Sequence, residues 1–292
     1  MAEVQLKEVY PVPEKIRKMA YISGMDAYKK LWERSIKESE KFWSEVASEY
    51  VTWFKKWDKV EDYNFDVRKG DIYVKYFVNG KLNVSYNCLD RHITAGLADR
   101  VAFHWRGEEG EQREITYGWL YEQTQRAANA LKDAGVRSGD VVGIFLPMIP
   151  EVVVAMLACA RIGAPHNVVF GGFSPESVKE RMDVSDAKAL ITVDGARRKG
   201  KTVAIKRAVD DVGMSVPATL VVRNTGIDDC PMGEGDLWWD EALAAADADC
   251  PAEPLPAEHP LFILYSSGST AKPKGILHTT GGYLTQVAST YK

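Results

Sequence analysis

The sequence predicts an α/β fold with a largely parallel sheet flanked by helices. From about residue 115 onward, short apolar runs alternate with amphipathic segments of helical length. This alternation is typical of βαβ units, in which helices cover both faces of a sheet. The first 60 residues carry a helical pattern instead, because residues 25–48 contain no proline and place apolar side chains near helical spacing. We therefore expect a helical N-terminal segment followed by an α/β domain.

The elements expected in the α/β part follow one another closely. Helices are predicted over residues 93–98, 117–134, 150–162, 174–184, 202–211, 239–247 and 280–290. Strands are predicted over residues 141–145, 166–170, 188–193, 218–223 and 261–265. Residues 72–86 alternate around Asn79-Gly80, a pair that tolerates positive φ, so a hairpin is expected there. Helix 280–290 has no cap signal at its end, which indicates that the sequence stops inside a longer domain.

Composition and charge exclude several functional classes. The 292 residues are 46% hydrophobic and 27% charged, as in a soluble globular protein. The net charge of −4 gives no reason to expect nucleic acid or an anionic membrane, so an anionic ligand must be bound by local clusters. The four cysteines form no CxxC pair, which argues against zinc and disulfides and favours a cytoplasmic protein with reduced thiols. Neither a signal peptide nor a membrane span is expected, since the longest apolar stretch is Val152–Cys159.

The most informative motif follows the predicted strand 261–265. Serine, threonine, glycine and lysine residues dominate positions 266–275. Hydroxyl groups and backbone N–H groups can donate to phosphate oxygens, while the lysines add positive charge. The spacing is not that of the P-loop NTPases, which have four residues between the first glycine and the Gly-Lys pair. The segment predicts a phosphate-binding loop, and the alternative is a serine- and glycine-rich surface turn.

Two other segments also follow predicted strands. Phe170-Gly171-Gly172 precedes a helix start where Ser174 suits the N-cap and Pro175 the first helical position. Glycines at the carboxyl end of a parallel strand lie where open α/β sheets bind ligands, although a tight turn also uses them. Residues 194–201 carry four cations and indicate either a solvated basic turn or a phosphate grip.

The five histidines predict no metal site. His104, His166 and His278 all flank apolar residues, where a structural histidine is more common than a metal ligand. The trio Asp90-Arg91-His92 lacks the serine that a charge relay would need. We interpret the trio as an ion pair and a helix cap at the entry to helix 93–98, and we assign no catalytic residue.

Six motifs carry a further signal, at residues 80–92, 146–151, 156–164, 170–176, 265–275 and 278–283. Together they resemble one family, the AMP-forming acetyl-coenzyme A synthetases of the adenylate-forming ligases. The resemblance runs from about residue 50 to the end, and the helical start is similar to the N-terminal extension of that family. In the phosphate loop, Ala271 replaces the second glycine of the usual pattern, at a steric cost of about 1 kcal/mol if that position has positive φ.

The resemblance implies a two-step ligase. ATP and acetate would form acetyl-adenylate and pyrophosphate, with Mg²⁺ accompanying ATP, and coenzyme A would then displace AMP. It also implies a helical extension over residues 1–65 and a partial AMP-binding domain over residues 66–292, without the mobile C-terminal domain. Such enzymes complete their two half-reactions by swinging that domain, so this chain alone is expected to be inactive.

The resemblance implies two groups of ligand-binding residues. The loop for the ATP phosphates comprises Ser266, Ser267, Gly268, Ser269, Thr270, Lys272, Lys274 and Gly275. The coenzyme A group comprises Phe170, Gly171, Gly172, Arg197, Arg198, Lys199, Gly200 and Lys201, where the motif fits Arg198–Lys201 most naturally and Arg197 if shifted by one. The alternatives are a ligase for propionate or acetoacetate, and a non-catalytic module that binds a nucleotide or coenzyme A. Neither acyl specificity nor oligomeric state is readable from this sequence.

Overall fold

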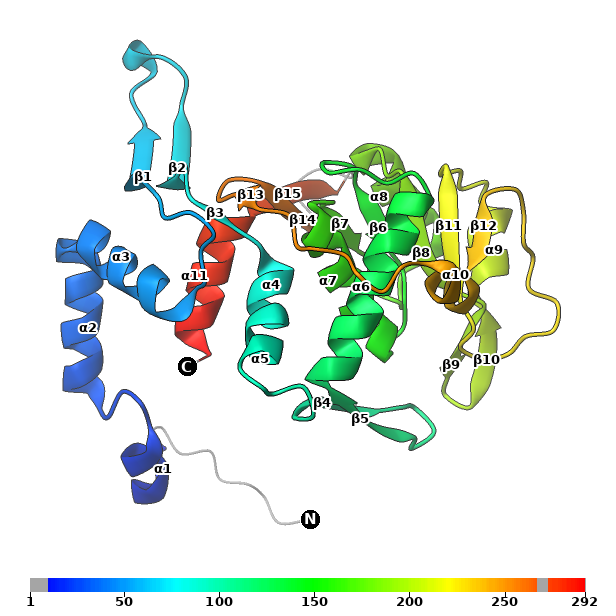
Figure 1. The fold of residues 1–292 in the computed structure, drawn as a ribbon, viewed down its shortest axis with the longest axis horizontal. Coiled ribbons are helices and arrows are strands. Elements are labelled where there is room, and N and C mark those ends of the chain that lie inside the picture. Colours follow the sequence, from blue (N-terminus) through cyan, green and yellow to red (C-terminus); the bar gives the residue numbers. More distant parts are fainter. Residues whose placement is uncertain (1–9, 267–272, 292) are drawn as a thin grey trace. The chain divides into compact units, whose positions relative to one another are not determined.

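The computed structural model describes residues 10–266 and 273–291, in two compact units (Figure 1). The first unit comprises Met1–Val51 and Thr285–Lys292, and the second comprises Thr52–Leu284. The described N-terminal residues are helical, as predicted, with α1 (Glu14–Met19), α2 (Met25–Lys37) and α3 (Ser39–Tyr50). The helical pattern of residues 25–48 is divided between α2 and α3, because the backbone leaves the helical conformation at Glu38.

The second unit is built on a seven-stranded sheet. Neighbouring strands are parallel throughout except for the last pair, β14 and β15, which is antiparallel. The largely parallel sheet predicted from the alternating pattern is therefore confirmed. In spatial order the strands are β12 (Asp236–Trp238), β11 (Ala218–Val222), β8 (Ala189–Val193), β6 (Val142–Ile144), β7 (His166–Val168), β14 (Pro260–Ser266) and β15 (Lys274–Thr279).

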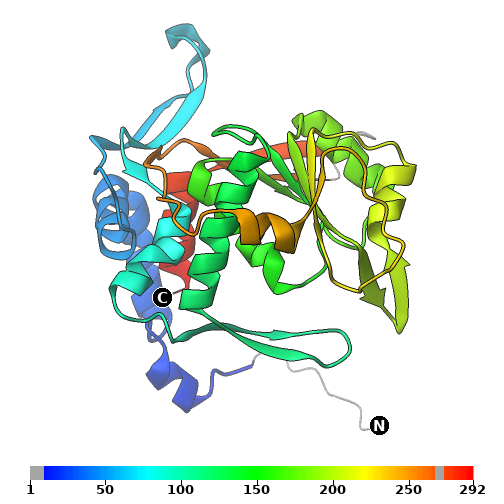
Figure 2. The same cartoon turned by 45° about the vertical axis from the view of Figure 1, so that its right-hand side comes forward.

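Helices cover both faces of this sheet (Figures 1 and 2). One face packs against α6 (Tyr117–Asp133), α7 (Pro150–Ile162) and α10 (Trp239–Ala245). The other packs against α8 (Pro175–Ser185) and α9 (Ile205–Asp211). Successive strand residues serve opposite layers, so that Ile191 lies in the first core and Leu190 in the second. This burial on both faces explains why the strands are continuous apolar runs.

The predicted helices lie close to their expected positions. Ser174 caps α8 by accepting the Ser177 N–H at 3.4 Å, and Pro175 occupies the first turn, as predicted. The last helix, α11, spans Thr280–Thr290. The helix expected at 93–98 begins earlier, as α4 (Val84–Cys88) and α5 (Asp90–Thr94).

The hairpin predicted around Asn79-Gly80 is wrong. Asn79 does adopt a positive φ of 62°, but the strands beside it pair elsewhere. β2 (Tyr73–Val78) pairs with β1 (Lys59–Asn64), and β3 (Lys81–Leu82) pairs with β13 (Leu255–Pro256). The local turn signal was correct, whereas the pairing was decided by partners distant in sequence.

Two further hairpins were not predicted. One consists of β4 (Val101–Arg106) and β5 (Gln112–Thr116). The other consists of β9 (Gly195–Arg198) and β10 (Lys201–Ala204), which takes the first residues of the helix expected at 202–211. Both hairpins project from the sheet toward one another in the two ribbon views (Figures 1 and 2).

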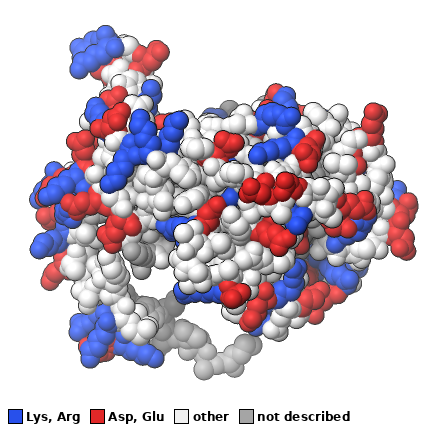
Figure 3. All heavy atoms as spheres, viewed as in Figure 1, with Lys and Arg blue, Asp and Glu red and all other residues white. Residues whose placement is uncertain are grey.

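The surface carries a mixture of charges. On the face shown in Figure 3, lysine and arginine side chains alternate with aspartate and glutamate, and neither sign forms a large area. This distribution agrees with the net charge of −4. Within the described ranges, every helix is too short or too polar to cross a membrane.

Candidate functional site

The three segments singled out in the sequence all leave the same edge of the sheet. β7, β8 and β14 are mutually parallel members of one sheet, so their carboxyl ends face one way. The strand order also reverses at β6, because the chain runs from β6 to β7 on one side and then crosses to β8 on the other. Open α/β sheets bind ligands at such a reversal, beyond the carboxyl ends of the strands.

The glycine turn after β7 presents an aromatic ring to solvent. Phe170 is 66% exposed, and its ring lies against Gly172, where an added Cβ would be only 2.5 Å from a ring carbon. A Cβ on Gly171 would lie 3.0 Å from the Leu146 carbonyl oxygen. Both glycines are therefore explained by close packing within the turn, and the turn also presents a flat aromatic surface to solvent.

The basic segment after β8 is a tight hairpin. Arg198 and Lys201 are paired across β9 and β10, and the two residues between them have positive φ, 50° at Lys199 and 72° at Gly200. This is the conformation of a two-residue type I′ turn. Because side chains alternate along a strand, Arg197 points to one face of the hairpin, while Arg198 and Lys201 share the other.

Asp194 anchors the base of this basic hairpin. Its carboxylate is buried and accepts backbone N–H groups from Gly195 and from each residue of the loop 224–227, at 2.6 to 3.2 Å. Burial alone would raise the pKa of Asp194, but these backbone donors outweigh it and lower the pKa from its ordinary value. Asp194 thus joins the carboxyl ends of β8 and β11 and fixes the direction in which β9 leaves the sheet.

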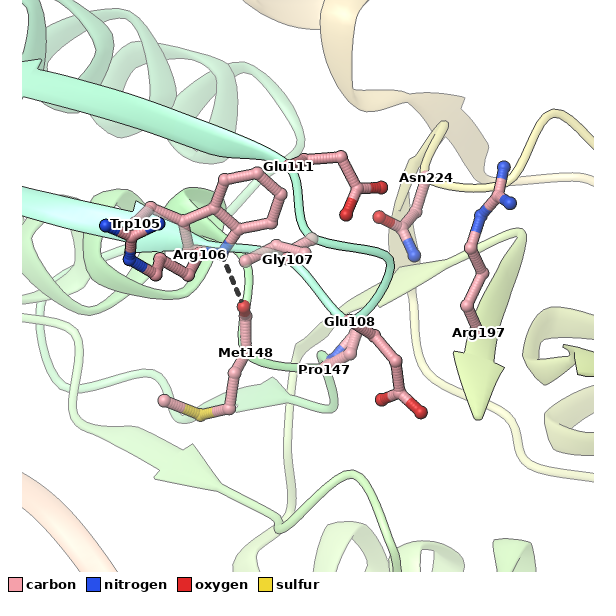
Figure 4. Close-up of a pocket in the computed structure, with 10 residues that line it drawn as sticks. Trp105, Arg106, Gly107, Glu108, Glu111, Pro147, Met148, Arg197 and Asn224 are labelled. Carbon is pink, nitrogen blue, oxygen red and sulfur yellow. Dashed lines mark hydrogen bonds between the residues drawn. The ribbon is translucent and has the colours of Figure 1, made fainter. Parts of the chain in front are cut away.

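A cavity of about 240 Å³ lies between the two unpredicted hairpins and the loop after β6 (Figure 4). Trp105 of β4 forms one wall and donates its indole N–H to the Met148 carbonyl oxygen at 2.7 Å. Arg197 and Asn224 line the opposite side. The cavity therefore lies at the carboxyl edge of the sheet, close to the strand-order reversal.

The acidic tip, defined as Glu108 and Glu109 between β4 and β5, contacts the basic hairpin. Arg197 donates to the Glu109 carboxylate, and the Lys199 backbone N–H donates to Glu108 Oε1 at 2.7 Å. Hydrogen bonding to Glu109 raises the pKa of the Arg197 guanidinium. Among the described residues, Arg198 and Lys201 have no ion-pair partner.

The predicted phosphate loop connects β14 to β15. Ser266, Lys274 and Gly275 are exposed, and Ser266 is paired with Lys274 at the carboxyl end of β14. This position is at the same edge of the sheet as the glycine turn and the basic hairpin. Ser267, Gly268, Ser269, Thr270 and Lys272, together with Ala271, lie outside the described residues.

Arg181 links the glycine turn to the end of β14. Its guanidinium lies 4.7 Å from the centre of the Phe173 ring and 5.3 Å from that of Tyr265. The Tyr265 hydroxyl donates to the Arg181 carbonyl oxygen at 3.3 Å, and burial raises the pKa of this tyrosine. Nothing in the sequence pattern pointed to Arg181, because its two aromatic partners are distant from one another along the chain.

The interpretation of Asp90-Arg91-His92 as a helix-capping device is corrected, because α5 has no side-chain cap hydrogen bond. Asp90 pairs with Arg161 of α7 instead, through two contacts of 2.8 Å.

The structural interpretation of His166 agrees with its environment, because burial lowers its pKa to about 4 and keeps the ring neutral near pH 7. The described part of the chain holds no group of three or more His, Cys, Asp or Glu suited to a metal ion.

Comparisons with known proteins point to one family. The AMP-binding enzyme family model matches residues 90–292, and the model described as acetyl-coenzyme A synthetase N-terminus matches residues 28–88. An acetyl-coenzyme A synthetase of Alkalilimnicola ehrlichii is 49% identical over 290 residues, which cover 98% of this chain and 44% of the relative. One from Streptomyces avermitilis is 51% identical over 253 residues, covering 86% of this chain and 38% of the relative.

A solved structure gives the same result for the fold. The acetoacetyl-CoA synthetase from Streptomyces lividans matches with a TM-score of 0.81 at 29% identity, covering 95% of this chain and 42% of the other. The predicted fold, an incomplete N-terminal part of an adenylate-forming enzyme, is confirmed. This chain spans less than half the length of each of these relatives.

Proposed function

The chain belongs to the AMP-binding enzyme family, and from that premise we propose that it forms part of a ligase joining acetate to coenzyme A. In the proposed reaction, ATP and acetate give acetyl-adenylate and pyrophosphate, and coenzyme A then displaces AMP to form the thioester. The observation that carries the proposal is the position of three segments. The glycine turn, the basic hairpin and the predicted phosphate loop all begin at the carboxyl edge of one sheet. Together with the relatives named above, this arrangement favours an enzyme over a non-catalytic binding module.

The proposed site for the ATP phosphates is the loop between β14 and β15. Its hydroxyl groups and backbone N–H groups would donate to phosphate oxygens, and its lysines would offset the negative charge. Exposed Ser266 and Lys274, side by side at the start and end of the loop, support this role. Mg²⁺ would arrive with ATP, as the counter-ion of its phosphates.

The proposed site for coenzyme A combines the glycine turn and the basic hairpin. The exposed Phe170 ring offers a flat surface for an adenine, which suits aromatic stacking. Arg198 and Lys201 lie on one face of the hairpin without ion-pair partners among the described residues, so both are available to a phosphate group. This support favours Arg198–Lys201 as the main phosphate grip, and Arg197, on the other face of the hairpin, is a further donor for a phosphate group of coenzyme A.

We also propose the domain organisation of the longer protein. Residues 1–65 would form an N-terminal extension and residues 66–292 the first part of the AMP-binding domain. The two family models meet further along the chain, between residues 88 and 90. The remaining length of the relatives would supply the acyl pocket and the mobile C-terminal domain. We propose acetate rather than acetoacetate as the substrate because of sequence identity. The acetyl-coenzyme A synthetases named above are 49% and 51% identical to this chain, whereas the acetoacetyl-CoA synthetase is 29% identical.

A chimera tests the proposal directly. Residues 1–292 are joined to the remaining part of the Alkalilimnicola ehrlichii relative, and acetate-dependent exchange of pyrophosphate into ATP is measured together with thioester formation. We expect both activities in the chimera and neither in residues 1–292 alone. Thioester formation with acetoacetate but not acetate would contradict the substrate assignment.

Two substitutions in the chimera separate the half-reactions. Lys274→Ala is expected to lower kcat/KM for ATP by about 10- to 100-fold, the range of a lost charge-assisted hydrogen bond. Lys201→Ala is expected to raise the KM for coenzyme A while leaving pyrophosphate exchange unchanged. Lys179→Ala is the matched control, because among the described residues this lysine forms an ion pair with Asp183 on the surface of α8 and with no other residue. Equal effects of all three substitutions would contradict the proposed sites.

A further inference from the structure

We propose that the acidic tip, Glu108 and Glu109, competes with a phosphate group of the ligand for the basic hairpin. The inference rests on the proposed function, in which the basic hairpin binds coenzyme A. It adds a role for the β4–β5 hairpin, which has no part in that proposal: two carboxylates set the affinity of the anion site by occupying its donors.

The contacts that carry the inference join two hairpins far apart in the chain. Arg197 and Glu109 are 88 residues apart, and Lys199 and Glu108 are 91 apart. A guanidinium and a backbone N–H are also the donors that bind phosphate oxygens most effectively. A carboxylate on each of them therefore occupies two positions that a phosphate group would use.

The base of the β4–β5 hairpin is fixed, whereas its tip is exposed. Ile115 of β5 is 2% exposed, and Trp105 is hydrogen-bonded to the loop after β6 at 2.7 Å. In contrast, the Arg197 and Glu109 side chains are 42% and 47% exposed. An exposed ion pair contributes little to stability, so a ligand can displace the tip without disturbing the core.

The arrangement also favours ligands with high negative charge. Glu109 neutralises Arg197, and Glu108 adds a second negative charge beside the turn of the basic hairpin. A dianionic phosphate interacts more strongly with the guanidinium than a single carboxylate does, so it can replace Glu109. A weakly charged anion gains too little to displace the tip.

Calorimetry on residues 1–292 at low ionic strength tests the competition, with coenzyme A and inorganic pyrophosphate as separate probes. Glu109→Gln is expected to tighten coenzyme A binding by about two- to fivefold, in line with the strength of exposed ion pairs. The matched control is Glu114→Gln, which removes the same charge from the same hairpin but faces His104. This control is expected to leave the affinity unchanged.

A second comparison, between variants that both lack Arg197, tests whether Glu109→Gln acts on ligand binding through that arginine. In an Arg197→Gln background, Glu109→Gln is expected to give no gain, because the donor under competition has been removed. Weaker binding by Glu109→Gln would overturn the inference, since it would mean that Glu109 positions Arg197 for the ligand. Equal binding by wild type and Glu109→Gln would also overturn it and would leave the coenzyme A assignment intact.

The two probes separate this inference from the proposed function. If no variant binds coenzyme A but Glu109→Gln binds pyrophosphate more tightly than wild type, the competition stands and the coenzyme A assignment fails. If all variants bind coenzyme A with one affinity, the assignment stands and the competition fails.

Discussion

Two arginine–carboxylate pairs in this protein share their chemistry and differ in burial. The Arg161 and Asp90 side chains are 1% and 14% exposed, whereas Arg197 and Glu109 are 42% and 47% exposed. The first pair lies among α5, α7 and the segment before β13, and the second lies between two surface hairpins at the carboxyl edge of the sheet.

The partners of Arg161 explain why its charge is fixed in place. Its guanidinium forms two hydrogen bonds of 2.8 Å to Asp90, one to the Cys250 carbonyl oxygen and one of 3.3 Å to Ser85. The ring of Tyr121 covers it at 5.4 Å. An arginine satisfied in this way belongs to the fold, whereas an arginine held by one exposed carboxylate can exchange that carboxylate for a ligand.

Breaking the buried pair should have the largest effect. Asp90→Ala leaves the Arg161 charge buried without its counter-ion, so we expect the free energy of unfolding to fall by about 3–5 kcal/mol. Urea denaturation followed by circular dichroism measures the change. The double variant Asp90→Leu with Arg161→Met removes both charges and should recover much of the loss. A loss of less than about 1 kcal/mol in the single variant would contradict a structural role for this pair.

Removing the anchor of the basic hairpin should have the next largest effect. Asp194→Ala deprives backbone N–H groups at the ends of β8 and β11 of their acceptor, so we expect a loss of about 2–3 kcal/mol. Asp194→Asn keeps one acceptor oxygen and should cost less. The same urea titration compares the two variants, and equal losses would indicate that the charge matters more than the number of acceptors.

The sequence predicted the layered fold because its signals were local. The α8 boundary followed from Ser174 and Pro175, which act within one turn of helix. The Asn79 turn was also recognised, but its strands pair with β1 and with β13, about 175 residues further along the chain. Strand pairing depends on partners that a local pattern does not specify.

The residues of the candidate site also fall into two groups, those predicted from a local pattern and those missed because their contacts are distant in sequence. Phe170 and the basic segment were placed at strand ends by the alternation of elements, and the sheet topology agrees. The contact of Glu109 with Arg197 was missed because it joins hairpins 88 residues apart. Asp194 had a usable signal, an acidic residue directly after five buried apolar or small residues of β8, which predicts a buried carboxylate in need of donors.

The pH dependence of stability sharpens the distinction between fixed and exchangeable charges. The pKa of Asp194 is lower in the folded protein than its ordinary value of 3.8, so the unfolded chain binds more protons than the folded one near that pH. Its contribution to stability is therefore present above the unfolded pKa and is lost as pH falls through the folded pKa. Urea midpoints between pH 7 and pH 3 should fall less steeply for Asp194→Asn than for wild type. Parallel curves would contradict the lowered pKa.

The smallest effect on stability is expected at the exposed pair. Glu109→Gln should leave the thermal midpoint within about 2 °C of wild type, because the core does not depend on a solvated ion pair. Differential scanning fluorimetry measures the midpoint, with Glu114→Gln as the control on the same hairpin. A decrease of more than about 5 °C would mean that Glu109 supports the fold as Asp90 does. In that event, burial would not be what distinguishes a structural arginine from one available to a ligand, and the contrast between the two pairs would fail.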